Sequence, residues 1–259
     1  MTPPAPLPVL VLVGCLLYTA CAARLRRRGD RWPVRRDAGF WLGGGLLVAA
    51  FAVPWGAWLP PFTAHTAAHL TAGMMAPLPV VLSRPVTLAL RTLPPPGRRA
   101  LVSLTRSRLV TALVFPPVAA VLDIGGLWLL YRAPLPPSVH HDPLVYLHLF
   151  AAGTLFTFAL LAVDPIRHRP GWAVRGGTLL AASAAHAILA KSLWATGPSG
   201  TAHTPADLHA ASQLMYYGGD AVELVLAVLL AGQWYRARGR CSRPHRGTRQ
   251  PATAQGGTR

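Results

Sequence analysis

Long stretches of this chain carry almost no charged side chain, although the chain as a whole is strongly basic. Lys and Arg together number 25 and Asp and Glu 8, which gives a formal net charge of +17. The nearly uncharged stretches cover residues 7–23, 38–58, 109–130, 143–162 and 176–196. A helix that crosses a bilayer needs about 20 mainly apolar residues. The pattern therefore predicts a polytopic membrane protein.

We expect an all-α membrane bundle of about seven transmembrane helices. The expected spans are residues 7–23, 38–58, 62–82, 109–131, 143–163, 176–196 and 209–235. Together they make residues 1–235 one transmembrane domain. The remaining residues, 236–259, are rich in Arg, Gly, Pro and Thr and poor in large apolar residues. That composition predicts a disordered basic tail that contacts anionic membrane lipid.

The basic residues alternate between loops and so predict the orientation of the bundle. The loops at 24–37, 83–108 and 164–175 and the tail hold every Lys and Arg except Arg132 and Lys191. Basic loops stay on the cytoplasmic side of a membrane. We therefore expect the N-terminus outside and the C-terminus in the cytoplasm. The charge is explained by topology, and we expect no nucleic-acid partner.

Titratable residues inside the apolar segments are the candidate functional residues, because such groups are costly in a bilayer and face a bundle interior or a cavity. His65 and His69 lie four residues apart and so share one face of a helix. Asp123, His148 and His186 lie on three other segments. At 1.5 Å per residue most of these groups fall roughly 8 to 16 Å below the outer boundary, which predicts one layer.

The last segment adds a polar stripe of five residues. Its members recur at helical spacing and lie within roughly 80° of arc; they are His209, Gln213, Tyr216, Asp220 and Glu223. We expect this stripe to face the bundle interior.

Two structural explanations of these polar residues remain open as alternatives to a functional site. A lone intramembrane histidine often only hydrogen-bonds a neighbouring helix. Asp220 and Glu223 could be the structural partners of Lys191, because a buried cation and carboxylate neutralise each other.

Several linked motifs resemble the multi-pass CtaG-type assembly proteins of bacterial cytochrome c oxidase, over residues 38–235. The motifs are His65-Thr-Ala-Ala-His69, Met74-Met75-Ala-Pro77, Arg84-Pro85-Val86-Thr87, His148, Val163-Asp164-Pro165, His186, Ala206-Asp207 and Met215-Tyr-Tyr-Gly218-Gly219-Asp220.

The resemblance implies a membrane protein that helps to assemble a haem-copper oxidase at the copper delivery or insertion step. Its metal ligands would be His65, His69, His148 and His186, and its partners oxidase subunits or copper chaperones. The family commonly places methionine beside the histidines of the third segment, where this chain has Thr66 and Leu70. Neutral imidazole also suits copper, and Asp123 or Asp220 could orient it.

No feature of the sequence points to catalysis. The chain lacks a nucleophile with an adjacent base, a phosphate-binding glycine loop and a dinucleotide fingerprint, so we expect no enzyme activity. We expect a multi-pass protein of the bacterial plasma membrane. Two other functions are alternatives to oxidase assembly. A metal or proton-coupled transporter would use Asp220, Glu223 and Lys191 as a relay. A b-type haem or quinone-linked redox protein would use the histidines as axial ligands, although we regard haem as the weaker alternative.

Overall fold

The computed structural model describes residues 6–136, 139, 142–165, 167, 169–199 and 203–241. Within these residues the chain is helical and contains no strand, as expected for an all-α protein. The elements, in chain order, are α1 (Pro6–Arg27), α2 (Val34–Ala52), the short 3-10 helix η1 (Trp55–Ala57), α3 (Pro61–His69), the π-helix η2 (Leu70–Met75), α4 (Pro77–Leu82), α5 (Pro85–Thr92), α6 (Pro95–Thr105), α7 (Arg108–Leu113), α8 (Pro116–Arg132), α9 (Pro143–Leu161), α10 (Trp172–Thr196) and α11 (Pro205–Cys241).

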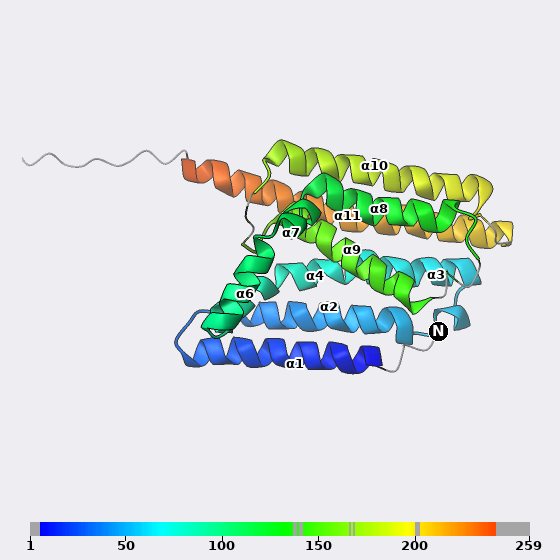
Figure 1. Ribbon diagram of the computed structural model, residues 1–259. Coiled ribbons are helices and arrows are strands. Elements are labelled where there is room, and N and C mark those ends of the chain that lie inside the picture. The colour runs from blue at the N-terminus through cyan, green and yellow to red at the C-terminus, as the bar shows by residue number, and fades with distance from the viewer. Residues whose placement is uncertain are drawn as a thin grey trace, which may run out of the picture.

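The long helices run side by side in one bundle, with α1 at one edge and α10 at the opposite edge (Figure 1). Neighbouring helices along the chain pack against each other in the pairs α1–α2, α8–α9 and α10–α11. Two distant parts of the chain also meet, because α11 packs against α3. The short helix α6 crosses the long helices at one end of the bundle (Figure 1).

Proline sets where many of these helices begin. It occupies the first helical position of α3, α5, α6, α8, α9 and α11. The first N–H groups of a helix have no partner within the helix, so proline loses nothing there, and its fixed φ suits the first turn. Proline residues therefore divide the chain into segments without weakening the helices themselves.

The third expected segment is a helical run that is interrupted by a π-helix. α3, η2 and α4 follow one another from Pro61 to Leu82. At the π-helix the backbone comes very close to α9. A Cβ atom added at Gly153 of α9 would lie only 1.9 Å from the carbonyl oxygen of Gly73. Only glycine permits this approach.

Among the described residues, four helices have the length and composition of membrane spans. They cover Leu7–Arg27, Pro143–Leu161, Trp172–Thr196 and Pro205–Gly239, and the bent pair Pro61–Leu82 and Pro85–Thr92 would make a fifth. The helix α2 has three charged residues in its first turn, Arg35, Arg36 and Asp37, and α8 has only 17 residues. The count of seven spans and the direction of the termini stay predictions.

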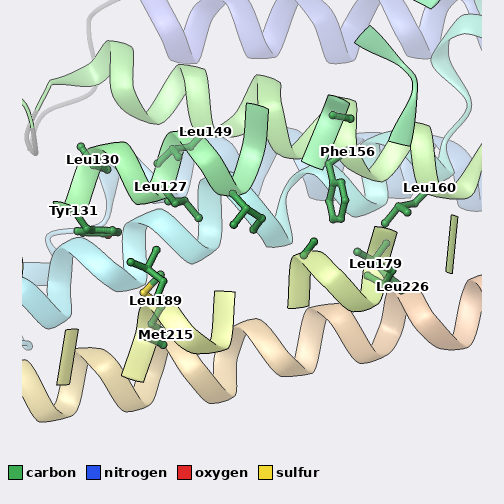
Figure 2. Close-up of a cluster of buried hydrophobic side chains, with 14 of the residues drawn as sticks. Leu127, Leu130, Tyr131, Leu149, Phe156, Leu160, Leu179, Leu189, Met215 and Leu226 are labelled. Atoms are coloured by element: carbon green, nitrogen blue, oxygen red, sulfur yellow. The ribbon is translucent and has the colours of Figure 1, made fainter. Parts of the chain in front are cut away.

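The largest buried apolar cluster joins α8, α9, α10 and α11 (Figure 2). Among its members are Leu127, Tyr131, Leu149, Leu189 and Met215. A second cluster joins α2 to α3, η2 and α9, and includes Phe51, Ala68, Ala72 and Tyr146. Since lipid is as apolar as these side chains, packing and hydrogen bonds must hold the helices together. The buried histidines of α3 lie between the two clusters.

The last helix is longer than expected. α11 continues from Tyr235 to Cys241, so the first residues of the expected disordered tail are helical. Residues 242–259 lie outside the described residues.

Candidate functional site

His65 is held in an aromatic box. Its ring is buried, and Nδ1 lies 2.7 Å from the hydroxyl oxygen of Tyr146 on α9. The rings of Tyr131 and Tyr146 meet it edge-on, with centroids 5.8 Å and 5.6 Å away, and Phe62 stacks at 6.3 Å. These contacts fix the orientation of the imidazole and connect α3 to α8 and α9.

His69, one turn further along α3, is buried without a hydrogen bond. Its side chain is 1% exposed, and neither Nδ1 nor Nε2 has a hydrogen-bond partner in the described part of the protein. It is the last residue before the π-helix. The next residue, Leu70, packs against Gly218 of α11, and His186 of α10 packs against the adjacent Gly219.

His186 is oriented by a carboxylate. Its Nδ1 lies 3.2 Å from Oε1 of Glu223 on α11, and both side chains are buried. The ring packs on the backbone of α11, where a Cβ atom at Gly219 would lie 2.0 Å from Cε1. Nε2 of His186 has no hydrogen-bond partner among the described residues. When Nδ1–H donates to the carboxylate, Nε2 keeps a free lone pair.

The site therefore offers unpartnered nitrogens from two helices. His69 comes from α3 and His186 from α10, and Glu223 of α11 orients the second. Asp123 lies on α8, where it is half-buried. Among the described residues, no three His, Cys, Asp or Glu side chains are grouped closely enough to hold a metal ion. The full layer of histidines and carboxylates stays a prediction.

His148 does not join this group. It is exposed on α9 and follows the buried Tyr146 by two residues, which places it about 200° around the helix from that side chain. It faces α8 instead, where a Cβ atom at Gly126 would lie 3.0 Å from its Nε2. The spacing of the motifs along the chain does not predict the direction of His148, because the packing of α9 decides which of its faces is buried.

The polar stripe of α11 does not point inward as a whole. His209, Gln213 and Asp220 are exposed, Tyr216 is half-buried, and only Glu223 is buried. The expectation of an inward stripe is therefore wrong for most of its members. The ring of His209 stacks on Trp194 of α10, with centroids 3.9 Å apart.

Lys191 does not neutralise the carboxylates of α11. Within the described residues it forms no ion pair with Asp220 or Glu223. Its ammonium lies 5.3 Å from the ring centroid of Tyr216 instead. Glu223 is held by His186 and not by Lys191, so the structural pairing considered from the sequence is not formed.

Two aspartates that were not predicted to be site residues each cap the first turn of a distant helix. Asp207 of α11 accepts hydrogen bonds from the backbone N–H groups of Phe62 and Thr63, both at 2.9 Å, and from the Thr63 hydroxyl at 2.7 Å. It thereby caps α3, which carries His65 and His69. In the sequence, Asp207 belongs to the Ala206-Asp207 motif of the family resemblance, which gave no indication of this capping role.

Asp164 does the same for α5 at another place in the bundle. It accepts a hydrogen bond from the backbone N–H of Thr87 at 2.8 Å and a second from the Thr87 hydroxyl. Burial raises the pKa of this carboxyl above its usual value, while the hydrogen bonds from Thr87 act in the opposite direction. Burial also lowers the pKa of His203, and nearby Asp207 opposes that shift.

Comparison with known proteins gives one family and three curated relatives. The family model described as cytochrome c oxidase caa3 assembly factor matches residues 16–237. Uncharacterized proteins of Mycobacterium bovis and Mycobacterium tuberculosis are each 35% identical over 197 residues, which is 71% of this chain and 29% of theirs. One of Mycobacterium leprae is 28% identical over 245 residues, 85% of this chain and 37% of its own. The chain thus spans about a third of the length of these relatives. No solved structure matches.

Proposed function

This chain belongs to the family of cytochrome c oxidase caa3 assembly factors, and from that premise we propose that it delivers copper to the oxidase in the bacterial plasma membrane. Copper is the cargo, which the protein binds and passes on. The proposed donors are His69 and His186. Glu223 holds the imidazole of His186 in the orientation that turns Nε2 toward the ion.

The observation that carries the proposal is the set of buried imidazole nitrogens without partners. Both nitrogens of His69 and Nε2 of His186 make no hydrogen bond among the described residues. A buried polar atom without a partner costs free energy, so such atoms call for an explanation. Neutral imidazole is a good copper ligand. A bound copper ion would use one nitrogen of His69 and Nε2 of His186.

The small number of donors suits transfer. His65 is engaged with Tyr146, and the described residues do not group three metal-binding side chains. An ion held by two imidazoles keeps coordination positions open. A ligand from an oxidase subunit or a copper chaperone would fill one of them, so that the ion moves by exchange of ligands and is not released into the membrane.

Copper binding tests the donors directly. The purified protein is titrated with copper in the presence of a competing chelator, and wild type is compared with His69→Ala, His186→Ala and His148→Ala. We expect the first two variants to lose affinity for copper. His148→Ala should match wild type, because His148 is exposed and faces α8, outside the proposed site. Equal affinity in all four proteins would contradict the proposed donors.

Oxidase activity tests the assembly role. Membranes from a strain that lacks the protein are assayed with and without added copper, after complementation by wild type, His69→Ala or His148→Ala. We expect wild type and His148→Ala to restore activity, and His69→Ala to restore it only with excess copper. Full activity in the deletion strain would contradict the assembly role. Full complementation by His69→Ala at ordinary copper would contradict the copper step alone.

A further inference from the structure

The outward side of α11 carries polar side chains in the half of the helix that begins at Pro205. We use the name polar face for His209, Gln213, Tyr217 and Asp220, which lie within about 80° of arc. All four are exposed, and the side chain of Tyr217 is 68% exposed. Further along the same helix the exposed residues become apolar, with Leu224 at 64% and Val228 at 63%.

A groove between α10 and α11 adjoins the polar face. It has a volume of about 460 Å³ and is lined by Gln213 and Tyr217 of the polar face, with Lys191 and Trp194 on the α10 side. Lys191 is exposed there, and its ammonium lies over the Tyr216 ring. The surface thus presents one carboxylate, one ammonium and one amide to whatever covers it.

Asp220 lies near the middle of the helix between two groups that mark membrane interfaces. His209 stacks on Trp194 at one end, and Arg238 lies 4.5 Å from the Trp234 ring centroid at the other. Tryptophan gathers at such interfaces. Asp220 is eleven residues from His209, or about 16 Å along the axis, in a hydrocarbon layer about 30 Å thick.

Lipid cannot satisfy Asp220 at this depth. Within the described part of the chain its carboxylate accepts no hydrogen bond and forms no ion pair, in contrast to Glu223, which faces inward onto His186. An ionisable side chain that faces lipid tails is costly, and such residues normally face protein or water. Gln213 would also leave its amide without partners in lipid. The polar face therefore requires a polar partner.

We propose that the polar face and the adjoining groove bind a transmembrane helix of a cytochrome c oxidase subunit. That helix would carry a hydrogen-bond donor or basic side chain opposite Asp220 and an acceptor opposite Lys191. The exposed small residue Ala221, beside Asp220, lets another helix come close. This inference rests on the proposed assembly function, and it identifies the surface at which the partner binds.

Photo-cross-linking in membranes tests the proposal. A photoreactive phenylalanine analogue replaces Tyr217, and in a control chain it replaces Leu17 of α1, which is 61% exposed on the helix at the opposite edge of the bundle (Figure 1). The oxidase subunits carry epitope tags. We expect an adduct with a tagged subunit from position 217 and none from position 17. An adduct with a second copy of this chain, or no protein adduct, overturns the proposal.

A substitution at Asp220 separates docking from copper binding. We expect Asp220→Leu to lower the yield of the adduct from position 217 about ten-fold, because a hydrogen bond to a charged group is lost, and Asp220→Asn to lower it less. The copper affinity of purified Asp220→Leu should equal that of wild type. An unchanged adduct in Asp220→Leu would overturn the proposed contact. Loss of copper binding in His69→Ala with the adduct retained would leave docking intact and isolate the copper step.

Discussion

At the scale of single residues, the histidines of the bundle differ in what orients their imidazole rings. His65 is tied to Tyr146, and His209 stacks on Trp194. His186 gives one nitrogen to Glu223 and leaves the other without a partner. The carboxylate fixes the tautomer and the orientation of the imidazole, as the outer partners of metal-binding histidines do.

Glu223 should therefore control copper affinity without contacting copper. We expect Glu223→Ala to weaken copper binding about 10- to 100-fold, as is usual when such an outer partner is removed. Glu223→Gln keeps an acceptor for Nδ1–H and should lose less. Chelator competition on the purified variants measures the effect, with Asp220→Asn as the control carboxylate outside the site. Wild-type affinity in Glu223→Ala would show that His186 needs no orienting group.

Gly153 is a second residue whose identity the structure explains. A methyl group there would meet the backbone of Gly73, which cannot rotate away as a side chain can. We expect Gly153→Ala to lower the free energy of unfolding by about 1–3 kcal/mol or more, as overpacking does. Gly45→Ala on α2, where a Cβ atom meets nothing within 4 Å, should be neutral or stabilising by up to about 1 kcal/mol. Thermal unfolding in detergent compares them, and equal stability would contradict the close approach.

At the scale of elements, aspartates from one helix or loop cap the first turn of another. Asp207 at the start of α11 caps α3, and Asp164 after α9 caps α5. Each receives a backbone N–H and the threonine hydroxyl from a Pro-x-Thr start. The first N–H groups of a helix need acceptors, and here these come from residues 144 and 77 positions away. The caps therefore fix how the helices sit beside each other.

Removal of the Asp207 cap should destabilise the bundle more than loss of a local cap. Asp207→Ala leaves two buried N–H groups without acceptors, and each such loss costs about 1–3 kcal/mol. Asp142→Ala removes an exposed cap within α9 and should cost about 1 kcal/mol. Because α3 carries His69, Asp207→Ala should also weaken copper binding. Thermal unfolding and copper titration measure both, and equal losses in the two variants would contradict the argument.

The raised pKa of Asp164 predicts a pH dependence of opposite sign to that of a usual salt-bridged carboxylate. In the folded state Asp164 takes up a proton at higher pH than its usual value of 3.8, because burial disfavours the charge. The folded state binds more protons, so wild type should gain stability relative to Asp164→Asn as the pH falls from neutral toward 3.8. Chemical unfolding at several pH values checks this. If the difference in the free energy of unfolding between wild type and Asp164→Asn stayed constant with pH, the prediction would be contradicted.

The elements also show what the sequence could and could not predict. The spacing of His65 and His69 placed both on one buried face of α3 because that face follows from helical periodicity. The same periodicity placed the five stripe residues on one side of α11, but it did not show whether that side faces the bundle interior. Neighbouring helices decide which face is covered, and most of the stripe is exposed. The capping role of Asp207 was out of reach because its partners lie 144 residues earlier in the chain.

At the scale of the whole molecule, the basic residues gather at one end of the bundle. α1 ends and α2 begins there, α6 crosses there, and α11 ends there (Figure 1). Pairing of Arg26 with Asp37 and of Arg91 with Asp30 uses only part of this positive charge. At the opposite end Arg132 donates hydrogen bonds to the Thr196 hydroxyl and the Gly197 carbonyl, both at 2.9 Å. The two ion pairs leave most of the positive charge at the α6 end, so the asymmetry that the sequence indicates is retained in the structure.

This asymmetry leads to a prediction for the orientation of the chain in the membrane. Basic loops remain in the cytoplasm, so the end with α6 should be cytoplasmic and the end with η1 should face outward. Single cysteines are introduced as Ala57→Cys in η1 and Ser103→Cys in α6, both at exposed positions, after replacement of Cys15, Cys21 and Cys241. A thiol reagent that cannot cross membranes should label position 57 in intact spheroplasts, and position 103 only after permeabilisation. The reverse pattern would place His69 and Asp207 nearer the cytoplasm, and copper would then have to reach the site from inside the cell.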